Sequence, residues 1–448
     1  MLGPNTTPRE RVTDVESRAL DFFQHVVAPV ISGPIRTDFW SRIVLQLSAE
    51  APAVRHAAMA VSSLYEGLQP YKPVDKKNPF AIQQYNRSIT RLRATPDDEA
   101  IVLVVCVLMT CVEMMQGNVD AAIQHCQHGI AILNSTTVSP WTRQRLVPLF
   151  CRLSILPFLH GRTPDSFPLL DDIEFLSLAR LDDTAPAPTT VEEVQVALDI
   201  FIPRCIHFVR TAEPFREKLP DDLPPDLLRK QAFLLEHLGR WKAVLDAFTR
   251  DRVLSAADNM TVYIVEIRYL IALIWVTMAF EPDEAAYDQH LTKFQRVVDL
   301  STLVLATSAA VAPASRPKFL FEMGFLPLLY FVVIKCRCLC TRVAALHSMR
   351  ALAVMRENLW DVDVMYAVAQ NVIEMENGVR VDAVDLKRDE PSRHQEKVGL
   401  VRAQLERIVE VPPAGGSYAA TNKRVTFILK RELQDVVIRE RIVMVPVE

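Results

Sequence analysis

The residues of this sequence best suited to metal chemistry are its cysteines, and their spacing decides whether they can bind a metal together. The chain has eight cysteines among its 448 residues, at positions 106, 111, 126, 151, 205, 336, 338 and 340. No two of them are three residues apart, so the Cys-x-x-Cys pairs typical of zinc sites are absent from the sequence. We therefore expect free thiols, no bound metal and no metal-ligating residue.

Two smaller groups come closest to a metal-binding pattern. In the run of Cys336, Cys338 and Cys340, a helix would place the outer two thiols on one face and turn the middle one about 160° away. Three thiolates would then not converge. His125 and His128 lie three residues apart on a predicted helix and could share a face. We interpret them as side chains of a partly exposed helix with a cysteine between them.

The sequence lacks the common templates for enzyme catalysis and nucleotide binding. No two glycines are two residues apart, which excludes the dinucleotide-binding fingerprint, and no glycine precedes a lysine, which excludes the phosphate-binding loop. No histidine is followed by glutamate, and the Gly-x-Ser-x-Gly elbow of hydrolases is missing. We predict that the chain is not an enzyme, and we assign it no catalytic and no cofactor-binding residue.

Three charged residues interrupt apolar stretches that have a helical pattern. They are Glu113, Glu266 and Arg268. Burying an unpaired charge is costly, so each must face water or meet a partner. Glu266 and Arg268 are two residues apart and point to different sides of a helix, so they cannot pair with each other. We predict that all three make structural ion pairs with neighbouring helices rather than contacts with a ligand.

Composition argues against several classes of partner for this large globular chain. The 50 Lys and Arg residues against 54 Asp and Glu residues give a net charge of −4, without the basic stripe of a nucleic-acid binder. The basic clusters, such as Lys76-Lys77 and Lys387-Arg388, are short and are interpreted as solvated surface. The N-terminal residues do not follow the basic-then-apolar order of a secretory signal, so we expect an intracellular protein.

The most apolar segments are too short between charges to predict a membrane span. Residues 262–280 contain Glu266 and Arg268, which leaves twelve uncharged residues from 269 to 280. A helix needs about 20 apolar residues to cross a bilayer. We interpret this segment, and the similar segment 101–115, as buried core helices.

Apolar residues recur at three- and four-residue steps nearly throughout, which predicts an all-α protein. Asn78 and Thr95 are expected to cap helices, and Gly117 to end one, with Asn118 capping its successor. Because the turn at 117–118 is so short, the helices on either side must form an antiparallel pair. The pattern predicts further helices over 227–248, 256–280, 284–307, 320–340, 341–357 and 360–377.

We expect one large domain, an array of antiparallel helix pairs over residues 17–410 with a loop near 181–190. Residues 1–16 are predicted to be a flexible N-terminal segment. The apolar period changes to two near residues 425–430, and a β-rich run follows over 436–445. A short β-hairpin is therefore predicted near the C-terminus, within an extension over residues 411–448.

Several segments resemble one known family. They read ALDFFQHVVAPVIS from residue 19, DFW from 38, APAVRHAAMAVSSLYE from 51, YNRSITRLR from 85 and CVEMMQGNVDAAIQHCQHGIAIL from 111. Residues 319–376 read FLFEMGFLPLLYFVVIKCRCLCTRVAALHSMRALAVMRENLWDVDVMYAVAQNVIEME. Together these segments are similar to the fungal-specific transcription factor domain. This domain is the all-helical regulatory region of zinc binuclear-cluster (Zn2Cys6) regulators, and the resemblance covers nearly the whole chain.

The residues that carry the resemblance also have physical roles in folding. Gly324 lies at the start of a predicted apolar helix, where glycine permits the close approach of a neighbour. Pro327 lies in the first turns, where proline is tolerated. Asn358 replaces the family's usual glycine and is the next-best residue for a left-handed turn. We expect it to end one helix, and Asp361 or a neighbour to cap the next.

The sequence departs from the family in one respect that bears on function. Members of the family carry six cysteines in a zinc cluster ahead of this domain, and that cluster inserts a helix into the DNA major groove. Here the domain begins within about twenty residues of Met1, and the cluster pattern is absent. The resemblance therefore implies a regulator that does not bind a specific DNA site through this chain alone. The segment 337–341 also departs from the family's more polar pattern.

Three functions remain open on the sequence. The first is a transcriptional regulator in the nucleus, with the cytoplasm as the alternative location. It would act through a dimer partner, other regulators or a small ligand and control metabolic or secondary-metabolite genes. The second is a helical receptor for a small apolar ligand such as a sterol, which the resemblance to sterol-uptake regulators implies. The third is an auxiliary biosynthetic enzyme on the same scaffold. The sequence names no ligand-binding residue for any of them.

Overall fold

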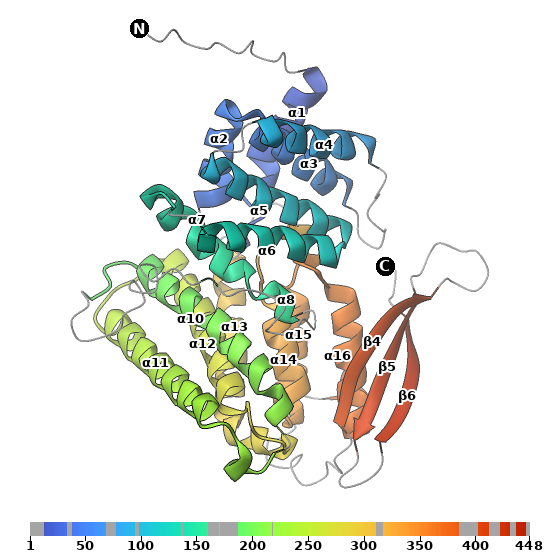
Figure 1. Ribbon diagram of the computed structural model, residues 1–448. Helices are drawn as coiled ribbons and strands as arrows, with labels where there is room; N and C mark the ends of the chain where they lie inside the picture. The colour runs from blue at the N-terminus through green and yellow to red at the C-terminus, as the bar shows by residue number, and fades with distance from the viewer. Residues whose placement is uncertain are drawn as a thin grey trace.

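The computed structural model confirms that the chain is mainly helical. It describes residues 13–33, 38–68, 78–94, 98–135, 138–159, 170, 187–216, 218–310, 317–384, 402–411, 422–430 and 436–444. The N-terminal helices, blue to cyan in Figure 1, lie above the helices that follow residue 190, and a small β-sheet stands beside the last helix.

The upper part consists of short to medium helices packed in pairs. They are α1 (Asp14–Phe22), α2 (Val44–Glu50), α3 (Pro52–Gly67), α4 (Pro79–Ala94), α5 (Glu99–Gln116), α6 (Val119–Ser135), α7 (Pro140–Leu153) and α8 (Leu156–Leu159), with π-helical turns η1 (Phe23–Val27) and η2 (Phe39–Ile43). Helix α3 packs against α4, and α5 against α6. The predicted antiparallel pair around residues 117–118 is therefore confirmed. Helix α1 begins inside the segment 1–16 that we predicted to be flexible.

The lower part contains the longest helices. They are α10 (Val191–Ala212), α11 (Pro225–Arg250), α12 (Ala256–Thr277) and α13 (Leu291–Ala310), with 3-10 turns η4 (Glu213–Phe215), η5 (Pro220–Asp222) and η6 (Glu284–His290). Helix α12 packs against α10, α11 and α13. The predicted helices over 227–248 and 256–280 are confirmed, whereas the one over 284–307 begins as the turn η6. Of the predicted loop near 181–190, residues 181–186 lie outside the described residues.

The region after residue 317 corrects two predicted helices. It contains β1 (Phe319–Leu320), α14 (Leu326–Lys335), α15 (Leu339–Leu352), β2 (Arg356–Glu357), β3 (Trp360–Asp361), α16 (Val362–Asn377) and η7 (Val381–Ala383). The helices predicted over 320–340 and 341–357 are thus wrong at both ends. Strand β1 pairs in parallel with β2, which pairs antiparallel with β3. The backbone at residues 319–320 and 356–357 therefore forms sheet hydrogen bonds, although its apolar pattern is equally compatible with a buried helix.

A second sheet follows at the C-terminal end and confirms the predicted change to β structure. Its strands β4 (Arg402–Val411), β5 (Asn422–Lys430) and β6 (Val436–Met444) are antiparallel in that order, with an irregularity in β4 between Leu405 and Arg407. The hairpin expected from the sequence corresponds to β5 and β6, whereas β4 was not expected. The sheet lies beside α16 (Figure 1).

Local capping signals explain where the helices of the upper part begin and end. The side chain of Asn78 accepts a hydrogen bond from the N–H of Ala81 at 3.0 Å, as predicted for the start of α4. Helix α5 is capped by Asp98 rather than by Thr95, which lies outside the described residues. Gly117 ends this helix with φ of 72°, in the left-handed conformation that glycine adopts at low cost.

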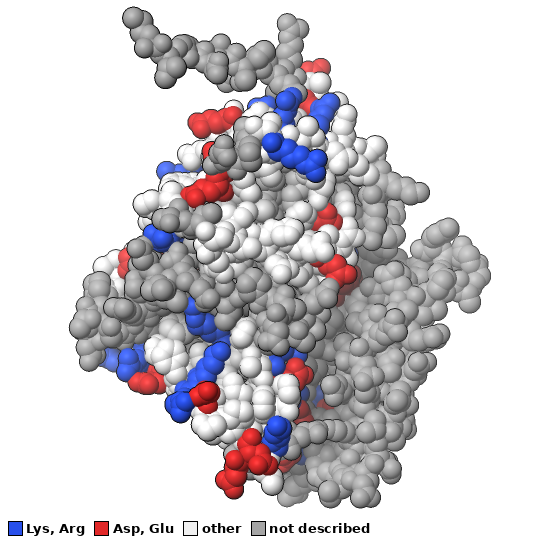
Figure 2. All heavy atoms as spheres, viewed as in Figure 1, with Lys and Arg blue, Asp and Glu red and all other residues white. Residues whose placement is uncertain are grey.

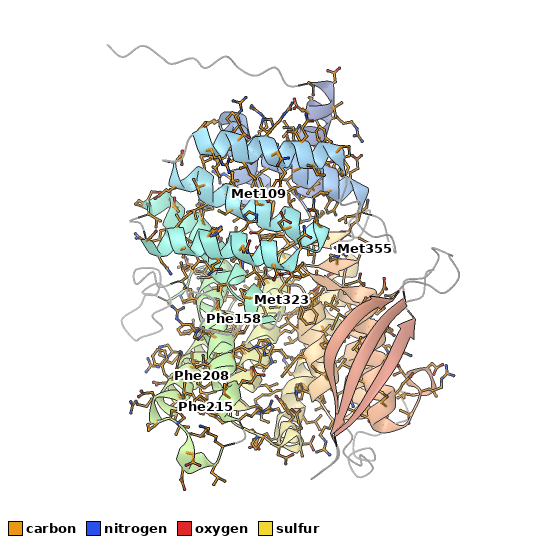
Figure 3. The ribbon with its side chains drawn as sticks, turned by 45° about the vertical axis from the view of Figure 1, so that its right-hand side comes forward. Met109, Phe158, Phe208, Phe215, Met323 and Met355 are labelled. Atoms are coloured by element: carbon orange, nitrogen blue, oxygen red, sulfur yellow. The ribbon has the colours of Figure 1, made fainter. Side chains whose placement is uncertain are left out.

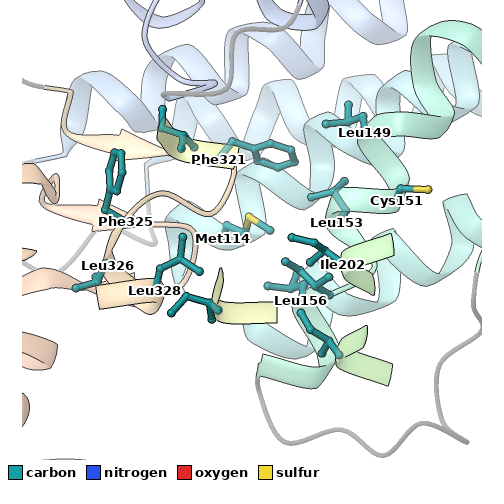
Figure 4. Packing of buried hydrophobic residues seen from close by; sticks show 14 of the residues in the cluster. Met114, Leu149, Cys151, Leu153, Leu156, Ile202, Phe321, Phe325, Leu326 and Leu328 are labelled. Carbon is teal, nitrogen blue, oxygen red and sulfur yellow. The ribbon is translucent and has the colours of Figure 1, made fainter. Parts of the chain in front are cut away.

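One continuous hydrophobic core joins the upper and lower parts. Figure 3 shows side chains filling the space between helices, with Met109 in the upper part and Phe208 in the lower. Figure 4 shows the junction, where Met114, Leu153, Ile202 and other apolar residues meet. The region that connects the two parts therefore belongs to the same buried core.

Two described helices, α5 and α12, are long and apolar enough to cross a membrane by length and composition. Both helices are longer than the uncharged runs within them, because the charged residues do not end the helices. Most of each helix is buried inside the protein. This burial agrees with our interpretation of both segments as core helices.

Candidate functional site: a buried charge cluster at the helix junction

The cysteines remain separate thiols. Cys336 and Cys338 are buried in the connection between α14 and α15, and the partly exposed Cys340 lies in the first turn of α15. The helix that we predicted through these residues is wrong, because α14 ends at Lys335. Burial raises the pKa of the Cys336 thiol to about 12, so this side chain stays protonated. Among the described residues, no group of three or more His, Cys, Asp or Glu side chains could hold a metal ion.

The two predicted histidines lie on α6 as ordinary helix side chains. His128 is exposed, and His125 is half-buried with its Nε2 atom 3.1 Å from the hydroxyl of Tyr85 on α4. Burial lowers the pKa of His125, so the imidazole is neutral at pH 7. The interpretation of this pair as a partly exposed helix face is confirmed.

The structure confirms ion pairs for two of the three charged residues that interrupt apolar helices. On α12, Arg268 pairs with Asp199 of α10, with 2.6 Å between Nη1 and Oδ1. Glu266 pairs with Arg296 of α13 at 3.0 Å. The carboxylate of Glu113 accepts a hydrogen bond from the side-chain amide of Asn118 at 2.7 Å, and the ion pair expected for this residue stays a prediction.

Arg268 belongs to a larger buried cluster that the sequence reasoning missed. Arg152 at the end of α7 donates from Nε and Nη2 to both carboxylate oxygens of Glu322, at 2.5 and 3.1 Å. Its third nitrogen, Nη1, donates to Asp199 at 3.1 Å. Asp199 therefore accepts from Arg152 on one oxygen and faces Arg268 with the other. We call these four residues the charge cluster.

The charge cluster is closed to water and balanced in charge. The side chains of Asp199 and Glu322 are 0% and 2% exposed, and that of Arg152 is 7% exposed. Burial raises the pKa of Glu322, and the adjacent Arg152 opposes that shift. Two guanidinium groups against two carboxylates leave no net charge. Each ion is therefore stabilised only while its partners stay in place.

Single charges within apolar segments were the signal that could have located this cluster. Arg152 lies in the segment PLFCRLSIL, Asp199 in VALDIFIP and Glu322 in FLFEMG. The same signal had drawn attention to Arg268. Sequence alone could not pair these residues, because Arg152 is 47 residues from Asp199 and 170 from Glu322.

Two other buried carboxylates lie near the last helices. Glu376 of α16 pairs with Arg342 of α15 at 2.7 Å. Glu357 on β2 accepts a hydrogen bond from the N–H of Leu326, the first residue of α14, at 2.8 Å. Gly324 makes room for this carboxylate, since a Cβ atom there would lie 2.7 Å from it. The close neighbour predicted for Gly324 is thus the carboxylate of Glu357.

The charge cluster is suited to holding helices together rather than to catalysis. Its four side chains neutralise one another, and none of them is an activated nucleophile beside a base. The cluster joins α7 of the upper part to α10, α12 and the connection between β1 and α14 in the lower part. It therefore links the upper and lower parts through buried ion pairs.

Comparison with known proteins finds a family match for part of this helical array. Residues 18–159 match the family described as the fungal specific transcription factor domain. This match confirms, for the upper part, the resemblance inferred from the sequence. Arg152 lies inside the matched segment, and its three partners in the charge cluster lie outside it.

A particular relative is known as well. Over 320 residues the chain is 25% identical to an aspercryptin biosynthesis cluster-specific transcription regulator of Emericella nidulans, covering 66% of this chain and 51% of the relative. The chain thus spans about half the length of the curated relative it matches. The matched family and this relative are transcription regulators, not enzymes. No solved structure shows significant similarity to the chain.

Proposed function

We propose that this chain is the regulatory part of a transcriptional regulator that controls a set of metabolic or secondary-metabolite genes. The observation that carries the proposal is the match of residues 18–159 to the fungal specific transcription factor domain. The similarity to a biosynthesis cluster-specific regulator supports the kind of target genes. Nuclear localisation follows from the same proposal.

The proposed mechanism is a change of shape on binding a partner or a small ligand. A ligand shifts such a protein only by binding one arrangement of its helices better than another. The junction between the upper and lower parts is suited to this role. Its ion pairs form only when the charged groups lie in particular positions, so the two parts would move between discrete arrangements rather than shift gradually.

DNA contact is proposed to come from a dimer partner or another regulator. The described Lys and Arg side chains are interspersed with Asp and Glu on the face shown in Figure 2, without a basic stripe. Many of the basic side chains are engaged in ion pairs, such as Arg296 with Glu266 and Lys335 with Glu284. We expect the purified chain to bind promoter DNA weakly and without sequence preference. A tight, specific gel shift by this chain alone, with steep salt dependence, would argue against it.

The decisive experiment is deletion of the gene in the organism that encodes it. We expect transcripts of a co-regulated group of metabolic genes to fall at least several-fold, and re-expression of the chain to restore them. A fluorescent fusion that complements the deletion should accumulate in the nucleus. If transcripts stay normal while a biosynthetic precursor accumulates, the chain is an enzyme and the proposal is wrong.

Native mass spectrometry of gently purified protein distinguishes the two ways in which the regulator could be switched. A stoichiometric apolar small molecule would identify it as a ligand receptor. Co-purification of a second regulator, without a small molecule, would show that binding of a protein partner switches the regulator. Addition of the correct ligand should also raise the melting temperature, because binding stabilises the folded state by mass action.

A further inference from the structure

The carboxylate of Glu357 is buried where the small sheet meets the start of α14. The side chain is 0% exposed, and its Oε2 atom accepts the hydrogen bond from the N–H of Leu326. The N–H groups of Gly324, Phe325 and Val354 also lie close to the carboxylate. Its other oxygen, Oε1, has no well-aligned hydrogen-bond donor in the described part of the chain. This oxygen is therefore free to carry a proton.

Backbone geometry holds Glu357 in this position. Glycine at position 324 is required, because a Cβ atom there would lie 2.7 Å from Oε2. Asn358 turns the chain from β2 to β3 with a φ of 59°, in the left-handed region. Its N–H donates to the carbonyl of Leu320 on β1 at 2.7 Å. The hairpin β2–β3 is thus held on one side by β1 and on the other by α14.

No cation in the surrounding described elements neutralises Glu357. On β2, Arg356 donates to the carbonyl of Met115 on α5 at 3.0 Å. After β1, Glu322 forms an ion pair with Arg152. At the far end of α14, Lys335 pairs with Glu284.

The acidic and basic groups on the opposite side are engaged as well. On β3, Asp361 accepts from the N–H of Val364 and caps α16. On α16, Asp363 pairs with Arg350 of α15, and Glu376 with Arg342. Ionised Glu357 is therefore stabilised only by backbone N–H groups, in a site without water access. Burial accordingly raises the pKa of Glu357 to about 7, although those N–H groups lower it.

We propose that Glu357 is a proton-controlled latch that fastens the hairpin β2–β3 to the start of α14. The protonated acid stays buried and keeps the hairpin closed. Loss of the proton places an unneutralised charge in the interior, and the hairpin opens to hydrate it. The latch thus loosens as pH rises through neutrality.

The sign and size of the effect follow from the linkage between proton binding and opening. The carboxyl of Glu357 binds its proton more tightly in the closed state than in the open one, where its pKa returns to about 4.3. Closure is therefore most favourable at low pH and is lost as pH rises through about 7. Between pH 6 and pH 8 these values give about a tenfold increase in the opening equilibrium.

Amide hydrogen exchange of the full chain at pH 6 and pH 8, corrected for the intrinsic pH dependence of exchange, tests the latch. We expect protection of the amides in 319–326 and 354–361 to fall about tenfold at pH 8, while that of α3 stays constant. In E357Q, whose side chain cannot ionise, protection should be independent of pH. The control E236Q, on the exposed face of α11, removes the same charge and should behave like the wild type.

The wild-type measurement decides the matter even if E357Q fails to fold. Equal protection of the hairpin at both pH values would overturn the proposal, as would an equal loss of protection throughout the molecule. A carbon-13 titration of the Glu357 carboxyl in the wild-type chain provides a second test. A midpoint near 7 supports the latch, and a midpoint below 5 overturns it.

Discussion

The guanidinium group of Arg152 binds two carboxylates at once, and water reaches neither of them. Each of its three nitrogens donates a hydrogen bond, two to Glu322 and one to Asp199. A planar, permanently charged group with a fixed fork of donors suits this role better than lysine would. Removing it would leave two buried carboxylates with only Arg268 to balance them.

We therefore expect R152M to lower the free energy of unfolding by about 3–5 kcal/mol, because the two carboxylates stay buried but lose the guanidinium group that neutralises them. Urea denaturation followed by circular dichroism measures the change. R240M is the matched control, since Arg240 pairs with Glu236 on the exposed surface of α11. Such a surface pair contributes less than about 1 kcal/mol.

The double variant R152M/E322M separates charge balance from packing. It removes one buried cation and one buried anion together, and leaves the pair of Asp199 and Arg268 intact. We expect it to recover a large part of the stability that R152M loses, since a buried ion pair replaced by apolar side chains is often neutral in stability. If R152M proves no less stable than R240M, the charge cluster does not hold the junction together.

Some contacts between helices depend on a glycine, because a larger side chain would not fit at that position. Gly129 on α6 lies against Phe150 of α7, and a Cβ atom there would come within 2.1 Å of the ring. Contact this close lets the two helices approach beyond what alanine allows. Gly239 on α11 has nothing within 4 Å of the same point, so it lacks this packing role.

Substitution by alanine is expected to have opposite effects on stability at these two glycines. G129A should destabilise the protein by about 1–3 kcal/mol, because overpacking forces the helices or the ring apart. G239A should stabilise it by about 0.5–1 kcal/mol, because alanine has the higher helix propensity. Thermal unfolding of the two variants beside the wild type measures both changes. Equal effects of the two substitutions would show that α6 and α7 adjust without cost.

In the molecule as a whole, the segment that matches the family packs closely against the rest of the chain. Its helix α7 contributes Arg152 to a cluster whose other members come from residues 199, 268 and 322. The apolar junction around the cluster combines α5 and α7 with α10 and the start of α14 (Figure 4). Upper and lower parts therefore stabilise each other.

Expressed alone, residues 13–159 should not form a stable domain, since Arg152 would lose its partners and the junction's apolar surface would be exposed. We expect the fragment to show helical circular dichroism with a broad urea transition at a much lower midpoint than the full chain. The full chain, measured under identical conditions, is the reference. A sharp transition of the fragment at the same midpoint would mean that the lower part contributes nothing to its stability.

The helical class, many helix ends and the ion pairs of Glu266 and Arg268 could be predicted from local sequence. These features depend on interactions over a few residues: apolar periodicity, caps such as Asn78 and Gly117, and the cost of burying a lone charge. Local signals failed at residues 319–320 and 356–357, where pairing between distant strands makes a sheet. An apolar pattern cannot distinguish such a strand from a buried helix.

Which charges meet depends on the packing of segments that are far apart in the chain. Arg152, Asp199 and Glu322 each stand alone in an apolar stretch, and nothing in the local sequence names their partners. The same holds for Glu357, whose burial and whose lack of a cation depend on the packing of β1, β3 and α14 around it. Electrostatic energy depends on distance in space and on exclusion of water, and both arise only when segments far apart in the chain come together.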